Sequence, residues 1–306
     1  MIIANNHGQV NVPPEQPPLT VEPQSELCHS PSGIPYIDWG GDGPPLHLAH
    51  ANGFPPATYR AFARCLAGYH CLSYEARPLW GGQDPGQFRH WRELAADLSQ
   101  FLRDVAPGPV IGVGHSLGAV TTLFSAAARP ALFRALVLID PVIFPLPMSP
   151  VLAVAERFSL SSRARLPTLT RRRRMEWASR EEVFSSFRRA HVFARWSDAA
   201  LWDYVTAVTE ERPEGGMRLR YSREWEARIF ETVPPDSWLA MLRLRALPTL
   251  VLRGELSTTF RSDTMRTMRW FVPRARFVQL EGADHFVPIT HPHETAEAVL
   301  SFLQGL

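Results

Sequence analysis

Residues 110–119 read Val-Ile-Gly-Val-Gly-His-Ser-Leu-Gly-Ala, and this stretch decides the fold. Its apolar start is typical of a buried strand, the pattern G-x-S-x-G follows, and small and apolar residues typical of a helix come directly after it. A serine on a tight turn from strand to helix has a strained backbone, so its neighbours must lack bulk. Gly114 and Gly118 meet that need, and the stretch predicts that Ser116 is a nucleophile.

On both sides of this stretch, short β-rich runs alternate with segments of helical apolar spacing. The predicted strands are 34–39, 46–50, 70–74, 110–113, 135–139, 249–252 and 276–280. The predicted helices are 59–66, 91–105, 117–128, 262–271 and 294–303. Such alternation predicts an α/β fold, in which a mostly parallel twisted sheet has helices on both faces.

The alternation stops between residues 144 and 246, where closely spaced prolines give way to segments rich in Arg, Glu, Trp and Phe. Strand-like runs vanish there, and residues 179–193 and 197–208 have the spacing of amphipathic helices. We therefore predict a helical insertion at 144–246, between core segments 33–143 and 247–306. Residues 1–32 are rich in proline and polar groups, which predicts an extended arm without a core of its own.

Composition excludes several classes of function. The chain has 306 residues, a formal net charge of +2 and no lysine, which rules out a lysine Schiff base and a Walker A motif. Three cysteines make neither a disulfide framework nor a metal quartet, and no metal or cofactor is expected. The arginine run 171–174 is typical of a solvated face, so no nucleic-acid partner is expected.

No apolar run approaches the roughly 18 residues that a membrane span needs. The first ten residues lack a basic segment followed by an apolar one, so we expect no secretory signal and a cytoplasmic protein without a membrane partner. The sequence leaves the oligomeric state open.

A serine hydroxyl needs a base to become a nucleophile at neutral pH. His285 lies in Gly-Ala-Asp-His-Phe-Val-Pro at 282–288, between the last predicted strand and the last predicted helix. This position fits the chain order serine, acid, histidine, and it predicts that His285 is the base.

Two backbone amides are candidates for holding a tetrahedral oxyanion. One is the amide of Leu117, after the nucleophile; the other lies in the loop His-Ala-Asn-Gly-Phe-Pro-Pro at 50–56. The Phe54 amide is the natural donor in this loop because the prolines after it have none. Asn52 is a further candidate, through its side chain.

The acid of the site has two candidates. In the commonest arrangement it stands three residues past the glycine that follows the strand 249–252, here Gly254, and Ser257 occupies that position. Glu255 is a nearby carboxylate. Asp140, at the end of the strand 135–139, is the other candidate, because a carboxylate at the same sheet edge can reach the same histidine. We favour Asp140 and keep Glu255 open.

With these motifs the chain, over residues 33–306, resembles the α/β-hydrolase superfamily. The matching residues are Asn-Gly-Phe-Pro at 52–55, Gly-His-Ser-Leu-Gly at 114–118, Asp-Pro at 140–141 and Gly-x-x-His at 282–285. The resemblance implies a helical cap after Asp140. It also implies that Asp140 stands where haloalkane dehalogenases and zearalenone-type lactonases place their acid.

One stretch departs from the superfamily. Where many relatives carry D-x-R-G-x-G, residues 75–81 read Glu-Ala-Arg-Pro-Leu-Trp-Gly. We expect Arg77 and Trp80 at the rim of the pocket, with Trp80, His115 and Asn52 contacting the substrate. A serine nucleophile argues against dehalogenase and epoxide-hydrolase chemistry, which the resemblance associates with aspartate.

The predicted activity is hydrolysis of a small-molecule carboxylic ester or lactone through an acyl-enzyme on Ser116. Aromatic residues of the insertion suggest an apolar or aromatic substrate group, although they can equally form the core of the cap: Trp177, Phe184, Phe187, Phe193, Trp196 and Trp202. Two alternatives remain, a carbon–carbon bond hydrolase acting on a diketone and a binding protein or receptor with little turnover.

Overall fold

The computed structural model describes residues 27–157, 161, 164–244 and 247–306. Most of the predicted N-terminal arm therefore lies outside the described residues. Its last part forms a strand, β1 (Leu27–His29), which pairs antiparallel with β2 (Pro35–Asp38). The arm thus joins the sheet at residue 27, which its proline-rich composition did not predict.

The core is an eight-stranded sheet in the order β1-β2-β4-β3-β5-β6-β10-β11. From β4 to β11 all neighbouring strands are parallel, and β2 joins β4 antiparallel. The remaining strands are β3 (Pro45–Ala49), β4 (His70–Tyr74), β5 (Val110–His115), β6 (Phe133–Ile139), β10 (Thr249–Gly254) and β11 (Arg276–Leu280). The predicted mostly parallel sheet is confirmed. Its interior strands β5 and β10 are buried along their whole length, as in parallel sheets covered on both faces.

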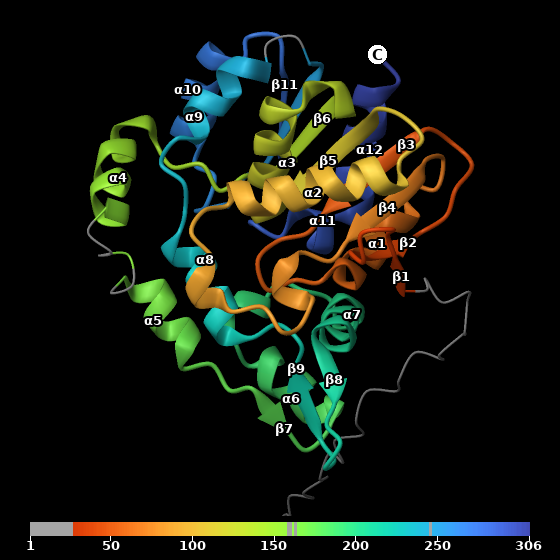
Figure 1. Cartoon of the computed structure of the whole chain (residues 1–306), viewed down its shortest axis with the longest axis vertical. Helices are drawn as coiled ribbons and strands as arrows, with labels where there is room; N and C mark the ends of the chain where they lie inside the picture. Colours follow the sequence, from red (N-terminus) through yellow and green to blue (C-terminus); the bar gives the residue numbers. More distant parts are fainter. Residues whose placement is uncertain (1–26, 158–160, 162–163, 245–246) are drawn as a thin grey trace, which may run out of the picture.

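Helices cover both faces of this sheet (Figure 1). Helices α2 and α3 pack together on one face, and α1 and α12 pack together on the other. The bounds are α1 (Arg60–Arg64), α2 (Arg92–Val105), α3 (Leu117–Ala128), α10 (Ser262–Phe271), α11 (Val287–Thr290) and α12 (Pro292–Leu303). The first ten residues of α3 are buried, so the helix that follows Ser116 lies deep in the core.

The segment between β6 and β10 leaves the sheet and returns to it, since β10 pairs directly with β6. Its helices are α4 (Ser149–Arg157), α5 (Arg165–Arg171), α6 (Arg180–Arg188), α7 (Asp198–Val208), α8 (Arg223–Glu231) and α9 (Ser237–Met241). The expectation that strands vanish here is wrong, because β7 (Glu176–Trp177), β8 (Thr209–Glu211) and β9 (Met217–Leu219) form a small antiparallel sheet. In Figure 1 this small sheet lies below the main sheet, and we call the whole segment, 144–246, the cap.

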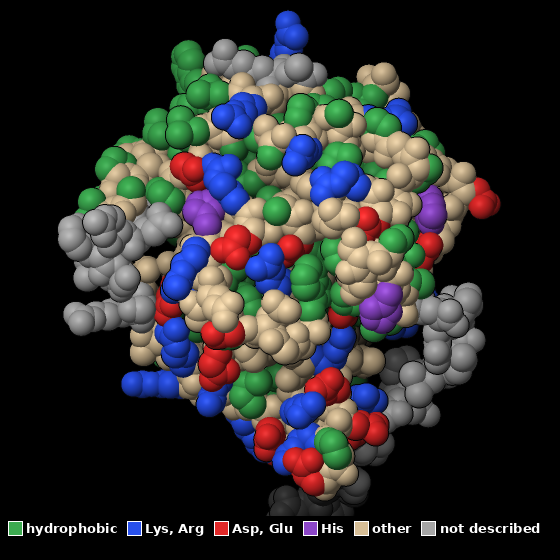
Figure 2. Space-filling view, viewed as in Figure 1, with side chains coloured by type: hydrophobic (Ala, Val, Ile, Leu, Met, Phe, Trp, Pro, Cys, Tyr) green, Lys and Arg blue, Asp and Glu red, His purple; other side chains and the backbone are tan. Residues whose placement is uncertain are grey.

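Charges of both signs are mixed on the surface of the cap. Figure 2 shows arginine and acidic side chains interspersed over its lower part, where β7, β8 and β9 lie. Two of these pairs are Arg212–Glu176 at 2.8 Å and Arg218–Glu210 at 2.7 Å. Within the part of the chain that the structure describes, no helix is long and apolar enough to cross a bilayer.

One buried histidine gives the core a dependence on pH. His47, in β3, is fully buried beside the rings of Tyr74 and Phe101, and neither of its ring nitrogens has a hydrogen-bond partner among the residues that the structure describes. Burial, helped by His50, lowers the pKa of His47 to about 3. As the pH falls below about 6.5, His47 therefore becomes protonated in the unfolded chain but stays neutral in the folded protein. The free energy of unfolding then falls by up to about 1.4 kcal/mol per pH unit.

We predict that His47→Leu makes the free energy of unfolding less dependent on pH. Between pH 7 and pH 5 the variant should lose about 2 kcal/mol less than the wild type, as measured by urea unfolding at both pH values. His50, with a pKa lowered to about 4 by burial, remains in the variant, so part of the acid sensitivity should persist. The exposed His191, changed to Gln, is the control that should leave the difference unchanged. An equal loss in wild type and His47→Leu would contradict the prediction.

Candidate active site

Ser116 occupies the turn between β5 and α3, with a strained backbone at φ 56° and ψ −115°. The two flanking glycines allow this turn because other backbone lies against them. A Cβ on Gly118 would stand 2.3 Å from the carbonyl oxygen of Ala49, and one on Gly114 would stand 2.5 Å from that of Gly118. The tight turn inferred from the glycine spacing is therefore present, and it presents the Ser116 side chain at the end of β5.

The structure brings Ser116, His285 and Asp140 together in one line of hydrogen bonds. The Ser116 hydroxyl donates to Nε2 of His285 over 3.0 Å. The other ring nitrogen, Nδ1, donates to Oδ2 of Asp140 over 2.6 Å. These three residues come from the ends of β5 and β6 and from the loop between β11 and α11, which all meet at the carboxyl edge of the sheet.

Asp140 is fully buried and is held from several sides. Ser257 donates to its Oδ2 over 2.6 Å, and the amide of Gly254 donates to its Oδ1 over 3.1 Å. Its backbone has a positive φ of 42°, which is uncommon outside glycine and costs energy unless the surroundings enforce it. Glu255, the alternative acid, instead accepts a hydrogen bond from the amide of Gly282 over 2.8 Å.

His115 is part of the framework behind the site and does not line the cavity, so its predicted substrate contact is wrong. It is fully buried, and its Nε2 donates to the backbone carbonyl of His285 over 2.8 Å. Its Nδ1 accepts from the Tyr59 hydroxyl over 2.8 Å, and that hydroxyl accepts from the Ala51 amide over 3.0 Å. Burial, together with the neighbouring His285, lowers the pKa of His115 well below its usual value, so the ring stays neutral.

The two predicted oxyanion donors differ in their surroundings. Leu117 is the first residue of α3, where an amide has no acceptor within the helix. The Phe54 amide donates over 3.2 Å to the carbonyl of Ala51, which closes a turn that requires the positive φ of 79° at Gly53. An oxyanion would therefore find the Leu117 amide available and would share the Phe54 amide with the turn.

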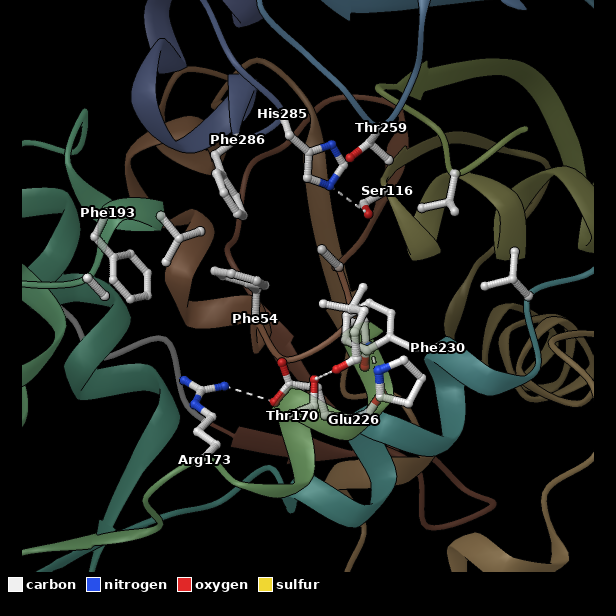
Figure 3. Close-up of a pocket in the computed structure, with 18 of the residues that line it drawn as sticks. Phe54, Ser116, Thr170, Arg173, Phe193, Glu226, Phe230, Thr259, His285 and Phe286 are labelled. Carbon is white, nitrogen blue, oxygen red and sulfur yellow. Dashed lines mark hydrogen bonds and ion pairs between the residues drawn. The ribbon is translucent and has the colours of Figure 1, made fainter. Parts of the chain in front are cut away.

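Ser116 and His285 open onto a cavity of about 1020 Å³ between the sheet edge and the cap. Eight of its lining side chains are Phe, Trp or Tyr: Phe54, Phe144, Trp177, Phe187, Phe193, Tyr204, Phe230 and Phe286. In the close-up of Figure 3, Ser116 and His285 lie at one end, Thr170, Arg173 and Glu226 lie at the other, and Phe54 lies between them. The cavity thus has an apolar middle with a polar group at each end.

The aromatic residues of the cap divide into two groups. Trp177, Phe187 and Phe193 line the cavity, as a substrate-binding role requires. Phe184 and Trp202 stack on each other at 4.4 Å and are not among the lining residues, so they belong to the core of the cap. Both interpretations of these residues therefore apply, each to some of them.

Three further expectations concern side chains near the cavity. Asn52 lines it, but both ends of its amide are bonded, to the Glu226 carbonyl over 3.1 Å and to the Tyr221 hydroxyl over 2.9 Å. Arg77 and Trp80 do not line it, so their predicted place at the rim is wrong. Arg77 instead binds the carboxylate of Asp97 over 2.8 Å, and the Trp80 indole donates over 2.6 Å to the backbone carbonyl oxygen of Glu75.

A polar cluster on the cap side of the cavity is not signalled by any pattern in the sequence. Arg173, taken as part of a solvated run, forms a 2.8 Å ion pair with Glu226 and donates to the hydroxyl of Tyr204 over 2.9 Å. All three residues line the cavity. They lie on separate segments of the cap, so only the three-dimensional fold brings them together. The exposed neighbours Arg171 and Arg172 do follow the expectation.

The chain is similar to proteins of known activity. It is 29% identical to monoglyceride lipase of Homo sapiens over 156 residues, which are 41% of this chain and 50% of that enzyme, so it spans about half the length of that relative. It is 26% identical to 2-(acetamidomethylene)succinate hydrolase of Mesorhizobium japonicum over 214 residues, 70% of each. A crystal structure of E-2-(acetamidomethylene)succinate hydrolase, 21% identical, has a TM-score of 0.73 and covers 89% of this chain and 95% of that one.

The sequence also matches the family described as "Alpha/beta hydrolase family" over residues 48–298. The matched range extends from β3 to α12 and includes Ser116, Asp140 and His285. The likeness of the solved structure supports the fold, and the family match covers most of the chain. The protein therefore belongs to the alpha/beta hydrolase family.

Proposed function

We propose that this protein is a serine hydrolase that cleaves a carboxylic ester or a lactone. The observation that carries the proposal is the line of hydrogen bonds from Ser116 through His285 to Asp140, beside a large apolar cavity. A nucleophile, a base and a group that orients the base, each within about 3 Å of the next, are what acyl transfer needs.

In the proposed reaction, Nε2 of His285 takes the proton of the Ser116 hydroxyl while Oγ bonds to the ester carbonyl carbon. His285 then gives this proton to the leaving alcohol oxygen, and a water hydrolyses the acyl-enzyme by the same steps. Asp140 holds the Nδ1–H of the ring and stabilises its charged form. The amides of Leu117 and Phe54 donate hydrogen bonds to the developing oxyanion, each stabilising it by about 3 kcal/mol.

The walls of the cavity support an ester with a sizeable apolar group. Burying one methylene against apolar walls is favourable by about 0.8 kcal/mol, which corresponds to roughly a fourfold gain in binding. The lining contains eight aromatic side chains along with Val142, Leu166 and Val192. A cavity of about 1020 Å³ is at the upper end of the range for small-molecule sites, so it has room for a long chain.

We predict that kcat/KM for p-nitrophenyl esters rises with acyl chain length from acetate to at least octanoate, by up to about fourfold per methylene. Steady-state kinetics over the series C2, C4, C6 and C8 measures this. Phe193→Ala should flatten the rise, whereas Trp202→Ala, in the cap core outside the cavity, is the matched control that should keep it. A rate that falls steadily beyond acetate would contradict an apolar acyl site.

The proposed function itself is tested by labelling with a fluorophosphonate probe, which modifies activated serines. Mass spectrometry of the folded wild type should find the probe on Ser116, with turnover of at least one ester of the series. A protein that is neither labelled nor active would contradict the proposal and favour a binding role. Turnover of a vinylogous diketone in place of esters would favour carbon–carbon bond hydrolysis.

A further inference from the structure

The turn at residues 51–54, which carries one proposed oxyanion donor, is contacted directly by the cap. The Tyr204 hydroxyl, from α7, donates over 3.3 Å to the carbonyl oxygen of Gly53. This oxygen belongs to the peptide group whose N–H is the Phe54 amide. Because a trans peptide is planar and its C=O and N–H point in opposite directions, a bond that holds the oxygen also fixes the direction of that N–H.

Tyr204 is in turn held by Arg173, whose Nη2 donates to the hydroxyl over 2.9 Å. Burial raises the pKa of Tyr204 even though Arg173 opposes it, so the hydroxyl remains protonated and is able to donate. Glu226 holds the other end of the guanidinium over 2.8 Å, and Figure 3 shows this pair at the end of the cavity away from Ser116. A chain of donors therefore runs from Arg173 through Tyr204 to the Gly53 carbonyl.

We propose that Tyr204 and Arg173 are positioning residues that aim and strengthen the Phe54 amide as an oxyanion donor. The inference rests on the proposed function. A hydrogen bond to a peptide oxygen polarises the whole peptide group and makes its N–H a stronger donor, the more so when the chain begins at a charge. The Tyr204 ring also stacks on the Phe54 ring, with 4.8 Å between the ring centroids. The hydroxyl of Tyr204 therefore holds Gly53 while its ring holds Phe54.

A second bond from the cap to this turn supplies a matched control. The Tyr221 hydroxyl donates over 2.9 Å to the side-chain oxygen of Asn52. Tyr221, like Tyr204, is fully buried, and removing its hydroxyl breaks a contact of the same kind between cap and turn. The same hydroxyl also contacts the backbone N–H of Gly53, which belongs to the peptide group before the one in question. Neither contact holds the peptide group that carries the Phe54 amide.

The test compares Tyr204→Phe with Tyr221→Phe on a p-nitrophenyl ester. Since removal of a whole oxyanion donor lowers kcat by about 10²–10³-fold, loss of its orientation in Tyr204→Phe should lower kcat by about 10–100-fold, with KM within about twofold. The inhibition constant of phenylboronic acid, whose tetrahedral adduct on Ser116 places an oxygen near the same amide, should weaken by a similar factor. Tyr221→Phe should keep kcat within about threefold, despite a comparable fall in Tm.

Arg173→Lys tests the hydrogen bond from Arg173 to the Tyr204 hydroxyl. It also provides a test of the proposal if Tyr204→Phe does not fold. It keeps the positive charge beside Glu226 but loses the planar fork that reaches two partners, so kcat should fall. In the Tyr204→Phe background the same change should have no further effect on kcat.

Equal kcat in Tyr204→Phe and wild type, or equal losses in Tyr204→Phe and Tyr221→Phe, would overturn the positioning role. Additive losses of kcat in the double variant Arg173→Lys, Tyr204→Phe would also overturn it. These results require a wild type that is labelled at Ser116 and active. An unlabelled, inactive wild type would instead refute the proposed function, and the positioning role with it.

Discussion

Ser116→Ala should lower kcat for a p-nitrophenyl ester by about 10⁵–10⁶-fold, the largest effect we expect from any single change in this protein. The substitution removes only the hydroxyl group, which is the group proposed to form the acyl-enzyme. The amides of Leu117 and Phe54 and the cavity walls remain, so some rate above the reaction in water should survive. Stopped ester assays measure kcat, and the fluorophosphonate probe should no longer label the protein.

The backbone at Ser116 makes a control possible that separates catalysis from folding. Its φ of 56° is strained for serine but accessible to glycine. Ser116→Gly should therefore lose activity as Ser116→Ala does, while gaining about 1 kcal/mol in free energy of unfolding relative to the alanine variant. Loss of activity together with loss of stability in both variants would point to a structural role for Ser116 instead.

The central fold was predictable because its signals are local in the sequence. The strand at 110–115 is buried throughout and begins with the apolar run 110–113. The helix after it, 117–128, begins and ends at the predicted residues. Long elements with a clear period keep their character in the fold because burial demands it at each position. The strand β4, buried at four of its five positions, begins and ends at the predicted residues for the same reason. The strand β11 also has the predicted bounds, although none of its residues is buried.

The small sheet of the cap was missed because its strands are too short to show a period. β7 has two residues and β8 and β9 have three each, so alternation has no length over which to appear. The helices predicted beside them, at 179–193 and 197–208, correspond to α6 and α7, which are long enough to carry an amphipathic pattern.

Contacts between side chains and partners distant in the sequence were also not predictable. Trp80 was expected at the cavity because of its type and its place after a strand, yet its indole instead donates to a carbonyl five residues away. Conversely, nothing local marks Tyr204, whose partner Gly53 lies 151 positions away. The position of Ser257 after its strand is visible in the sequence, but nothing local reveals its bond to Asp140, 117 positions away. A sequence pattern reports which residue types are present, but it does not report which pairs the fold brings into contact.

Asp140→Asn should lower kcat by about 10⁴-fold if Asp140 orients the proposed base. The amide of asparagine can donate to Nδ1 of His285, which would place the ring proton on Nε2, where it faces the Ser116 hydroxyl and prevents proton transfer. The matched control is Glu255→Gln, which should change kcat by less than about tenfold because Glu255 is bonded to the Gly282 amide. Steady-state kinetics across pH 6–9 compares the two. A loss below tenfold in Asp140→Asn would exclude it from the role.

The position of Ser257 allows this acid to be moved. Its hydroxyl lies 2.6 Å from Oδ2 of Asp140, the same oxygen that lies 2.6 Å from Nδ1 of His285. A carboxylate introduced by Ser257→Asp in the Asp140→Asn background would therefore stand close to the same imidazole nitrogen, and we expect it to restore at least about tenfold of the lost kcat. Ser257→Ala in the same background should restore none, because it adds no acceptor. Equal rates in the two double variants would contradict the inference that positions 140 and 257 serve one imidazole from neighbouring strands.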